Sequence, residues 1–140
     1  MTYDYIINID ATVPLRQPAD IERCFQTVHE DPDATNAYTV CPTRKNPHLN
    51  MVDLRSGGYA RLVADSEVPV VHRQDVPSVY EKNAAVYVFE REFLVATDAF
   101  YGPPTRTSVM PPERSVDIDT PWNLQLVEFL YSRQEFETDG

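Results

Sequence analysis

The sequence predicts an α/β protein, and three segments near its start carry that prediction. Residues 5–9 and 37–41 are short apolar, β-branched runs of the kind that form buried strands. Between them, residues 18–29 place apolar side chains at the i, i+3, i+4, i+7 spacing of one helix face, and Pro18 suits the first helical position. Because strand, helix and strand in this order build parallel sheets, we expect a parallel sheet here.

The middle of the chain has a different sequence pattern, with short strand-like runs, glycines and prolines in place of an amphipathic helix. Residues 50–54 and 59–63 are strand-like and are joined by Arg-Ser-Gly-Gly, which is a hairpin signal. Pro69 and Pro77 are incompatible with a central strand or a long helix in the stretch that follows. We therefore expect an antiparallel excursion from the main sheet.

The last third returns to strands and a helix. Residues 84–89 are apolar almost throughout, which predicts a strand covered on both faces. Residues 105–110 and 115–118 are further candidate strands. Thr120 as N-cap and Pro121 at the first position predict the start of a final helix.

Charge and composition exclude several classes of protein. The 140 residues carry 12 Lys and Arg against 22 Asp and Glu, a net charge of −10, whereas nucleic-acid binders need a basic surplus. No apolar run approaches the roughly 20 residues of a membrane helix, and the polar start is unlike a signal peptide. We expect a single domain over residues 1–140, located in the cytoplasm, with neither nucleic acid nor membrane as partner.

Familiar catalytic and cofactor motifs are missing from the sequence. With only 4 glycines it contains no complete glycine-rich phosphate loop, and its three histidines show no metal-ligand spacing. Cys24 and Cys41 form no CxxC pair, so we expect two reduced thiols in or near the core.

A pair of aspartates is the most informative feature for chemistry. If residues 115–120 are extended, Asp117 and Asp119 share one face while Val116 and Ile118 point into the core. Two neighbouring carboxylates repel each other unless a cation or proton relieves them, and Mg²⁺ is commonly held by one or two carboxylates together with substrate phosphates. The same spacing also fits a solvated strand end that leads into a capped helix.

Four arginines could bind an anion or form surface ion pairs. Arg16 follows the loop after the first strand, where open α/β sheets place their ligands. Arg73 lies in a loop between prolines, and its planar guanidinium suits a carboxylate or a phosphate. For Arg73, Arg106 and Arg114, composition alone favours surface ion pairs.

Five segments stand in a recognisable order along the chain. They are Thr-Val-Pro-Leu-Arg at 12–16, Asn-Pro-His-Leu-Asn-Met-Val at 46–52, Arg-Gln-Asp-Val-Pro-Ser-Val-Tyr at 73–80, Asn-Ala-Ala-Val-Tyr-Val-Phe at 83–89 and Met-Pro-Pro-Glu-Arg-Ser-Val-Asp-Ile-Asp-Thr at 110–120. Together they resemble the acylneuraminate cytidylyltransferases, also called CMP-sialic acid synthetases, over residues 5–131.

The resemblance implies a fold and a reaction. The fold is a three-layer, Rossmann-like sheet of the nucleotide-diphospho-sugar-transferase type, here partial, with residues 46–80 as an antiparallel arm that forms a homodimer. The reaction is the Mg²⁺-dependent transfer of CMP from CTP to the anomeric hydroxyl of a nonulosonic, sialic-type sugar acid, with release of pyrophosphate. The chain corresponds to the C-terminal portion of such an enzyme.

The resemblance also implies roles for individual residues. Asp117 and Asp119 become Mg²⁺ ligands and form the catalytic set with Arg16. The substrate-binding residues are Thr12 in the loop after the first strand, Arg73 and Gln74 reaching the sugar acid in the partner's site, and Tyr80 and Asn83 lining the same region.

The sequence departs from the family pattern at three places. Asp10 stands where the family has a glutamine, which alters contacts to the sugar acid, and Asn83-Ala84 replaces an Asn-Gly pair. The family's first strand and its glycine- and arginine-rich loop for the CTP phosphates have no counterpart here. An alternative function is therefore a non-catalytic, dimerising module that binds a sugar acid, and the identity of that acid is open among sialic, legionaminic, pseudaminic and ketodeoxyoctonic acids.

Overall fold

The computed structural model describes residues 3–64, 74, 76–97, 102 and 104–138, with side chains up to Arg133. The chain divides into two compact units. The first comprises residues 1–41 and 82–140, and the second comprises residues 42–81. The range 46–80, expected to form an arm, falls inside the second unit.

The first unit is built on a mixed four-stranded sheet. Its strand order is β1 (Tyr5–Ile9), β5 (Tyr80–Glu90), β2 (Asn36–Pro42) and β6 (Thr105–Val109). β1 is antiparallel to β5, and β2 is parallel to β6. The α/β class is confirmed. The two strands of the predicted strand-helix-strand unit, β1 and β2, are not neighbours, because β5 lies between them. The parallel pair is instead formed by β2 and β6.

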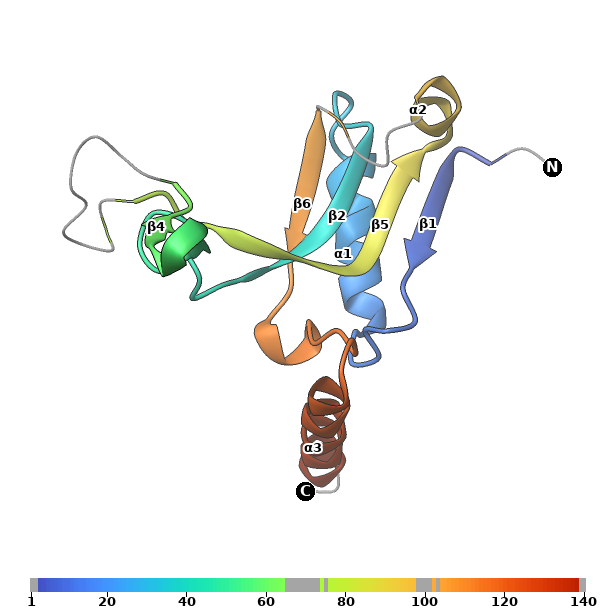
Figure 1. Ribbon diagram of the computed structural model, residues 1–140. Coiled ribbons are helices and arrows are strands. Elements are labelled where there is room, and N and C mark those ends of the chain that lie inside the picture. Colours follow the sequence, from blue (N-terminus) through green and yellow to red (C-terminus); the bar gives the residue numbers. More distant parts are fainter. Residues whose placement is uncertain (1–2, 65–73, 75, 98–101, 103, 139–140) are drawn as a thin grey trace. The chain divides into compact units, whose positions relative to one another are not determined.

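Helix α1 (Pro18–His29) covers one face of this sheet (Figure 1). The predicted bounds are confirmed, because Pro18 occupies the first position and the carboxylate of Asp20 accepts the backbone N–H of Gln17 at 2.9 Å. Cys24 and Val28 on the helix are buried in the core with Val86, Val88 and Met110 among others. The helix is thereby fixed to the sheet by its apolar face.

β1 was expected to be buried, and this expectation is wrong. It lies at the edge of the described sheet, and Ile7 and Ile9 are each 41% exposed. β5 is an inner strand of this sheet, and its side chains are buried on both faces. Val86 and Val88 lie on one face, and Phe89 lies on the other. A short apolar run in the sequence predicts a strand but does not show whether that strand lies at the edge or inside the sheet, because the strand order depends on the rest of the chain.

The second unit contains the predicted hairpin. β3 (Val52–Leu54) and β4 (Ala60–Leu62) pair in antiparallel register. The turn between them places Gly57 and Gly58 at φ of +83° and +81°, a conformation that glycine adopts without steric cost. The hairpin prediction is confirmed, whereas Arg73 lies outside the described residues.

Residues 115–118 do not form the expected strand. After β6 the chain enters a short 3-10 turn over Pro112–Arg114, in which Arg114 N–H donates to Pro111 O at 3.1 Å. The following residues are irregular, because Ser115 N–H donates within the turn to Pro112 O at 3.1 Å and Ile118 N–H donates to Thr12 O in the loop after β1, so neither takes part in a sheet ladder. The predicted strand is therefore a loop.

The final helix, α3 (Pro121–Thr138), begins where the sequence predicts. The hydroxyl of Thr120 accepts the backbone N–H of Asn123 at 3.2 Å, which is an N-cap bond. A shorter helix, α2 (Arg91–Ala96), follows β5. None of the helices in the described part of the chain is long and apolar enough to cross a membrane.

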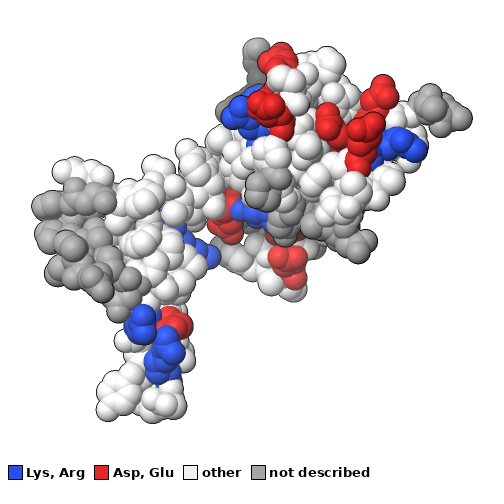
Figure 2. Space-filling model, turned by 90° about the horizontal axis from the view of Figure 1, so that it is seen from above, with Lys and Arg blue, Asp and Glu red and all other residues white. Residues whose placement is uncertain are grey.

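Acidic side chains gather on the first unit. Figure 2 shows them over the end of that unit at which β5 runs into α2, and the pocket there is lined by Asp4, Glu90 and Glu92 together with Arg91. No broad basic patch is visible among the coloured side chains of that view.

Candidate functional site

The loop after β1 brings three of the predicted site residues together. The carboxylate of Asp10 accepts hydrogen bonds from the backbone N–H of Thr12 at 3.0 Å and from its hydroxyl at 2.8 Å. The guanidinium of Arg16 donates to the backbone carbonyl of Asp10 and, at 2.7 Å, to that of Val13. Asp10, Thr12 and Arg16 thus form one locally bonded loop.

Electrostatics keep Asp10 ionised in this loop. The backbone hydrogen bond from Thr12, followed by the bond from its hydroxyl, holds the pKa of Asp10 below its ordinary value. Val13 is fully buried and Leu15 is 5% exposed, so the core anchors the loop. The arrangement holds a carboxylate and a guanidinium close to the end of β1.

A backbone hydrogen bond joins this loop to the aspartate-containing segment. Ile118 N–H donates to Thr12 O at 2.9 Å. Asp117, the preceding residue, is half-buried, and its Oδ1 atom is buried without a hydrogen-bond partner in the described part of the chain. Asp119 is exposed. The two aspartates therefore differ in environment, and the strand alternation on which their pairing was predicted is absent.

Arg114 forms a buried ion pair instead of the surface pair that composition favoured. Its Nε and Nη2 atoms donate to the two oxygens of Asp20 at 2.9 and 2.8 Å. The side chain of Asp20 is fully buried and that of Arg114 is 19% exposed. Burial alone would raise the pKa of Asp20, but the hydrogen bonds from Arg114 and then from Gln17 outweigh it and hold the pKa below its ordinary value.

Asn83 lies in the core beneath the segment that carries Asp117. Its side-chain oxygen accepts the hydroxyl of Thr39 at 2.7 Å, and its amide nitrogen donates to the Ser115 hydroxyl at 2.9 Å. Ser115 in turn donates to Pro111 O at 2.8 Å. At 5% exposure, Asn83 is engaged within the protein, and its predicted contact with substrate stays a prediction.

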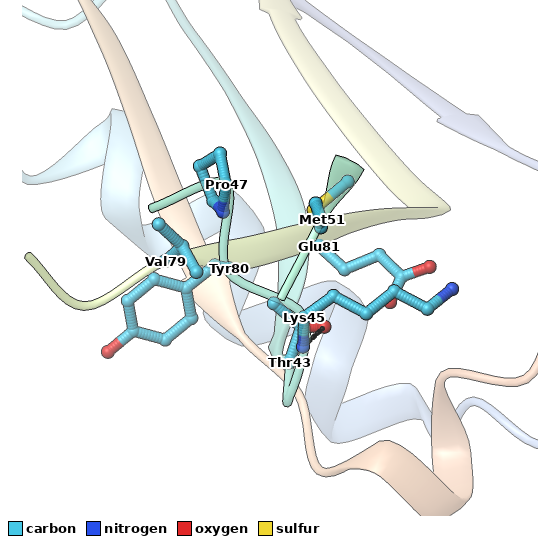
Figure 3. A pocket seen from close by; sticks show the side chains of 7 residues that line it. All are labelled: Thr43, Lys45, Pro47, Met51, Val79, Tyr80 and Glu81. Carbon is cyan, nitrogen blue, oxygen red and sulfur yellow. Dashed lines mark hydrogen bonds between the residues drawn. The ribbon is translucent and has the colours of Figure 1, made fainter. Parts of the chain in front are cut away.

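The remaining predicted residues belong to the second unit. Gln74 is exposed, and Tyr80 is 52% exposed beside a pocket of about 420 Å³. Figure 3 shows Met51 and Val79 supplying apolar surface to this pocket, with the charged ends of Lys45 and Glu81 on the same side. The pocket combines an apolar wall with one cation and one anion.

The structure narrows which groups could hold a metal ion. Among the described residues, no group of three or more His, Cys, Asp or Glu side chains is arranged to do so. A cation at Asp117 would therefore take most of its ligands from water or bound substrate, which is usual for Mg²⁺. The cysteines offer no alternative, because both are buried, and burial raises the pKa of Cys24 to about 12.

Sequence reasoning missed the groups that support this site. Asp20, Thr39 and Ser115 bond to Arg114 or Asn83, and none of them was singled out. Only Asp20 carried a local signal, since an acidic residue in the first turn is favoured at a helix N-terminus. The partners of Thr39 and Ser115 are distant in the chain, so no local pattern could indicate them.

The fold and the site define an α/β protein whose carboxylates lie in loops next to a mixed sheet. No model of a known protein family matches the sequence. Curated proteins do align with it, among them the following two. One is the post-translational flagellin modification protein B of Campylobacter coli, 32% identical over 135 residues, or 96% of this chain and 56% of that protein. The other is the CMP-N,N'-diacetyllegionaminic acid synthase of Campylobacter jejuni, 34% identical over 94 residues, or 67% of this chain and 39% of that protein.

These relatives confirm the resemblance found in the sequence. Their similarity supports a CMP-nonulosonic acid synthetase-like family for this chain, and the name of the second relative is of that kind. The chain spans about half the length of the first of these relatives and less of the second.

Proposed function

We propose that this chain takes part in the transfer of CMP from CTP to the anomeric hydroxyl of a nonulosonic acid, with Asp117 as a Mg²⁺ ligand. The similarity to a CMP-N,N'-diacetyllegionaminic acid synthase supports the reaction class and favours a bacterial, legionaminic-type acid. The observation that carries the proposal is the buried Oδ1 atom of Asp117, which has no hydrogen-bond partner among the described residues.

The chemistry of this oxygen fits a hard cation. A buried carboxylate oxygen without a donor costs free energy unless a proton or a cation approaches it. Mg²⁺ prefers carboxylate oxygens and retains ligand positions for water and phosphate. Asp119, two residues further along and exposed, supplies a second carboxylate. Asp117 and Asp119 are the residues that would hold the ion.

Attack of the sugar hydroxyl on the α-phosphate requires charge neutralisation and alignment more than a strong base. Bound Mg²⁺ supplies the neutralisation of phosphate charge. Arg16 supplies a fixed positive charge in the loop that is bonded to residue 118 through Thr12. Asp10, which accepts both hydrogen bonds of Thr12, rigidifies the loop in place of the family's glutamine.

We also propose that the second unit forms a homodimer in the cytoplasm and carries Arg73, Gln74 and Tyr80 to the sugar acid of the partner. Exposed apolar side chains on the hairpin support this, since Leu54 is 79% and Tyr59 is 77% exposed. The same surface favours the alternative function, a dimerising module that binds a sugar acid without catalysis.

The test is isothermal titration of Mg²⁺ together with CTP into the purified chain and its Asp117→Asn variant. We expect Asp117→Asn to weaken Mg²⁺-dependent binding at least tenfold, because asparagine keeps the shape and removes the charge. The matched control is Asp33→Asn, which changes an exposed aspartate on the loop after α1 and should leave binding intact.

Two outcomes would contradict the proposal. Equal Mg²⁺ binding by the parent chain and Asp117→Asn would show that Asp117 is not a Mg²⁺ ligand. Binding of a nonulosonic acid without any response to Mg²⁺ and CTP would favour the non-catalytic module. Pyrophosphate release with CTP and legionaminic acid then measures turnover directly.

A further inference from the structure

We infer that Arg114 is a positioning residue for Asp117, acting through its ion pair with Asp20. The inference rests on the proposed function, because it concerns how the carboxylate that would hold Mg²⁺ is kept in place. The family resemblance assigns no role to Arg114 or Asp20, and composition alone favoured a surface ion pair for Arg114.

The first step is that the ion pair joins two otherwise separate elements. Asp20 lies in the first turn of α1, and Arg114 ends the 3-10 turn that follows β6. The two donors of Arg114 meet the two oxygens of Asp20 at 2.9 and 2.8 Å, which is a planar, two-point contact. Such a contact fixes orientation as well as distance.

The second step is that Asp20 is itself immobilised. Its Oδ2 atom also accepts Gln17 N–H at 2.9 Å, and its side chain is fully buried. Cys24 and Val28 hold the same helix to the core. Arg114 is therefore anchored to a rigid body.

The third step is that Asp117 lies between fixed points. Ser115, next to Arg114, is held by Asn83 at 2.9 Å, and Ile118 N–H is held by Thr12 O at 2.9 Å. Only Val116 and Asp117 separate these anchors. A short segment tethered at both ends restricts where the Asp117 carboxylate can go, and a ligand held in place before binding loses less entropy when the ion arrives.

The experiment replaces Arg114 with lysine, which keeps the positive charge but cannot make the planar two-point contact. We expect Arg114→Lys to lower Mg²⁺ affinity, measured by titration with CTP present, by about tenfold or more, as the loss of a group that orients a metal ligand typically does. We also expect faster hydrogen exchange at the Ile118 amide.

The matched control is Arg106→Lys. Arg106 also pairs with an aspartate, Asp31, in the loop after α1. The side chain of Arg106 is 59% exposed, however, and the pair lies at the start of β6 rather than beside Asp117. This variant should change neither the Mg²⁺ affinity nor the exchange of Ile118. A purely structural role of Arg114 would lower the melting temperature and leave both readouts unchanged in the folded protein.

The outcomes separate this inference from the proposed function. If the parent chain binds Mg²⁺ and Arg114→Lys binds it equally well, the positioning role is overturned while the proposed function stands. If the parent chain binds no Mg²⁺, the proposed function fails, and unchanged exchange at Ile118 in Arg114→Lys would overturn the positioning role as well.

Discussion

At the scale of single residues, Ala84 stands where the family pattern has glycine, and this replacement strains the backbone. Its φ is +56°, in the left-handed region, where a Cβ atom is crowded by the backbone. The flanking side chain of Asn83 holds this conformation by accepting the N–H of Ala85 at 3.2 Å and the hydroxyl of Thr39 at 2.7 Å. Local strain is thus tolerated because a buried polar network surrounds it.

We predict that Ala84→Gly raises the free energy of unfolding by about 1 kcal/mol, because glycine adopts a positive φ without the steric penalty. Urea denaturation measures the change. The matched variant Ala85→Gly, at a fully buried neighbour with an ordinary φ, should destabilise the protein. A loss of stability in Ala84→Gly would show that the methyl group contributes more than the strain costs.

At the scale of elements, Asp20 links the start of α1 to the turn after β6. Its pKa is lowered in the folded protein by Arg114 and Gln17 against the effect of burial. A carboxylate whose folded pKa lies below its unfolded value stabilises the protein fully above the unfolded pKa, which is about 3.9. That contribution is lost as the pH falls through the folded pKa.

We therefore predict that Asp20→Asn lowers stability at pH 7 and flattens the dependence of stability on pH below about 4. Chemical denaturation between pH 7 and pH 3 measures this. Asp33→Asn, at an exposed aspartate in the loop after α1, should keep the parent's pH dependence. An unchanged acid slope in Asp20→Asn would mean that other carboxylates govern acid unfolding.

At the scale of the whole molecule, the chain separates into a sheet-and-helix unit and a hairpin unit. The described hairpin exposes the large apolar side chains of Val52 and Leu54 on β3 and of Tyr59 in the turn. Surfaces of this kind commonly mark protein–protein contacts. This exposure is the physical basis for the proposed dimer.

We predict that the parent chain sediments as a dimer and that Leu54→Glu shifts it toward monomer, because the change places a charge in an apolar contact. Val95→Glu is the matched control, since Val95 is 75% exposed on α2 in the other unit. A monomeric parent chain, or equal dissociation by both variants, would contradict an interface at the hairpin.

The sequence by itself determined the features that depend on neighbouring residues. Pro18 and apolar spacing defined α1, Thr120 and Pro121 defined the start of α3, and the Gly-Gly turn defined the hairpin. It also brought out Asp10, Thr12 and Arg16, which are close in the chain and are bonded together in the structure. Short-range hydrogen bonds and side-chain periodicity depend on consecutive residues, which is why the predictions of these elements were confirmed. The substrate-binding and catalytic roles of Asp10, Thr12 and Arg16 stay predictions.

Only the tertiary structure decided the features that depend on distant partners. It put β1 at the edge of the described sheet, turned residues 115–118 into a loop, and paired Arg114 with Asp20, 94 positions away. It also gave Asp117 and Asp119 different environments. Burial and long-range pairing arise when separate elements pack together, and the free energy of that packing is not encoded in any one local segment.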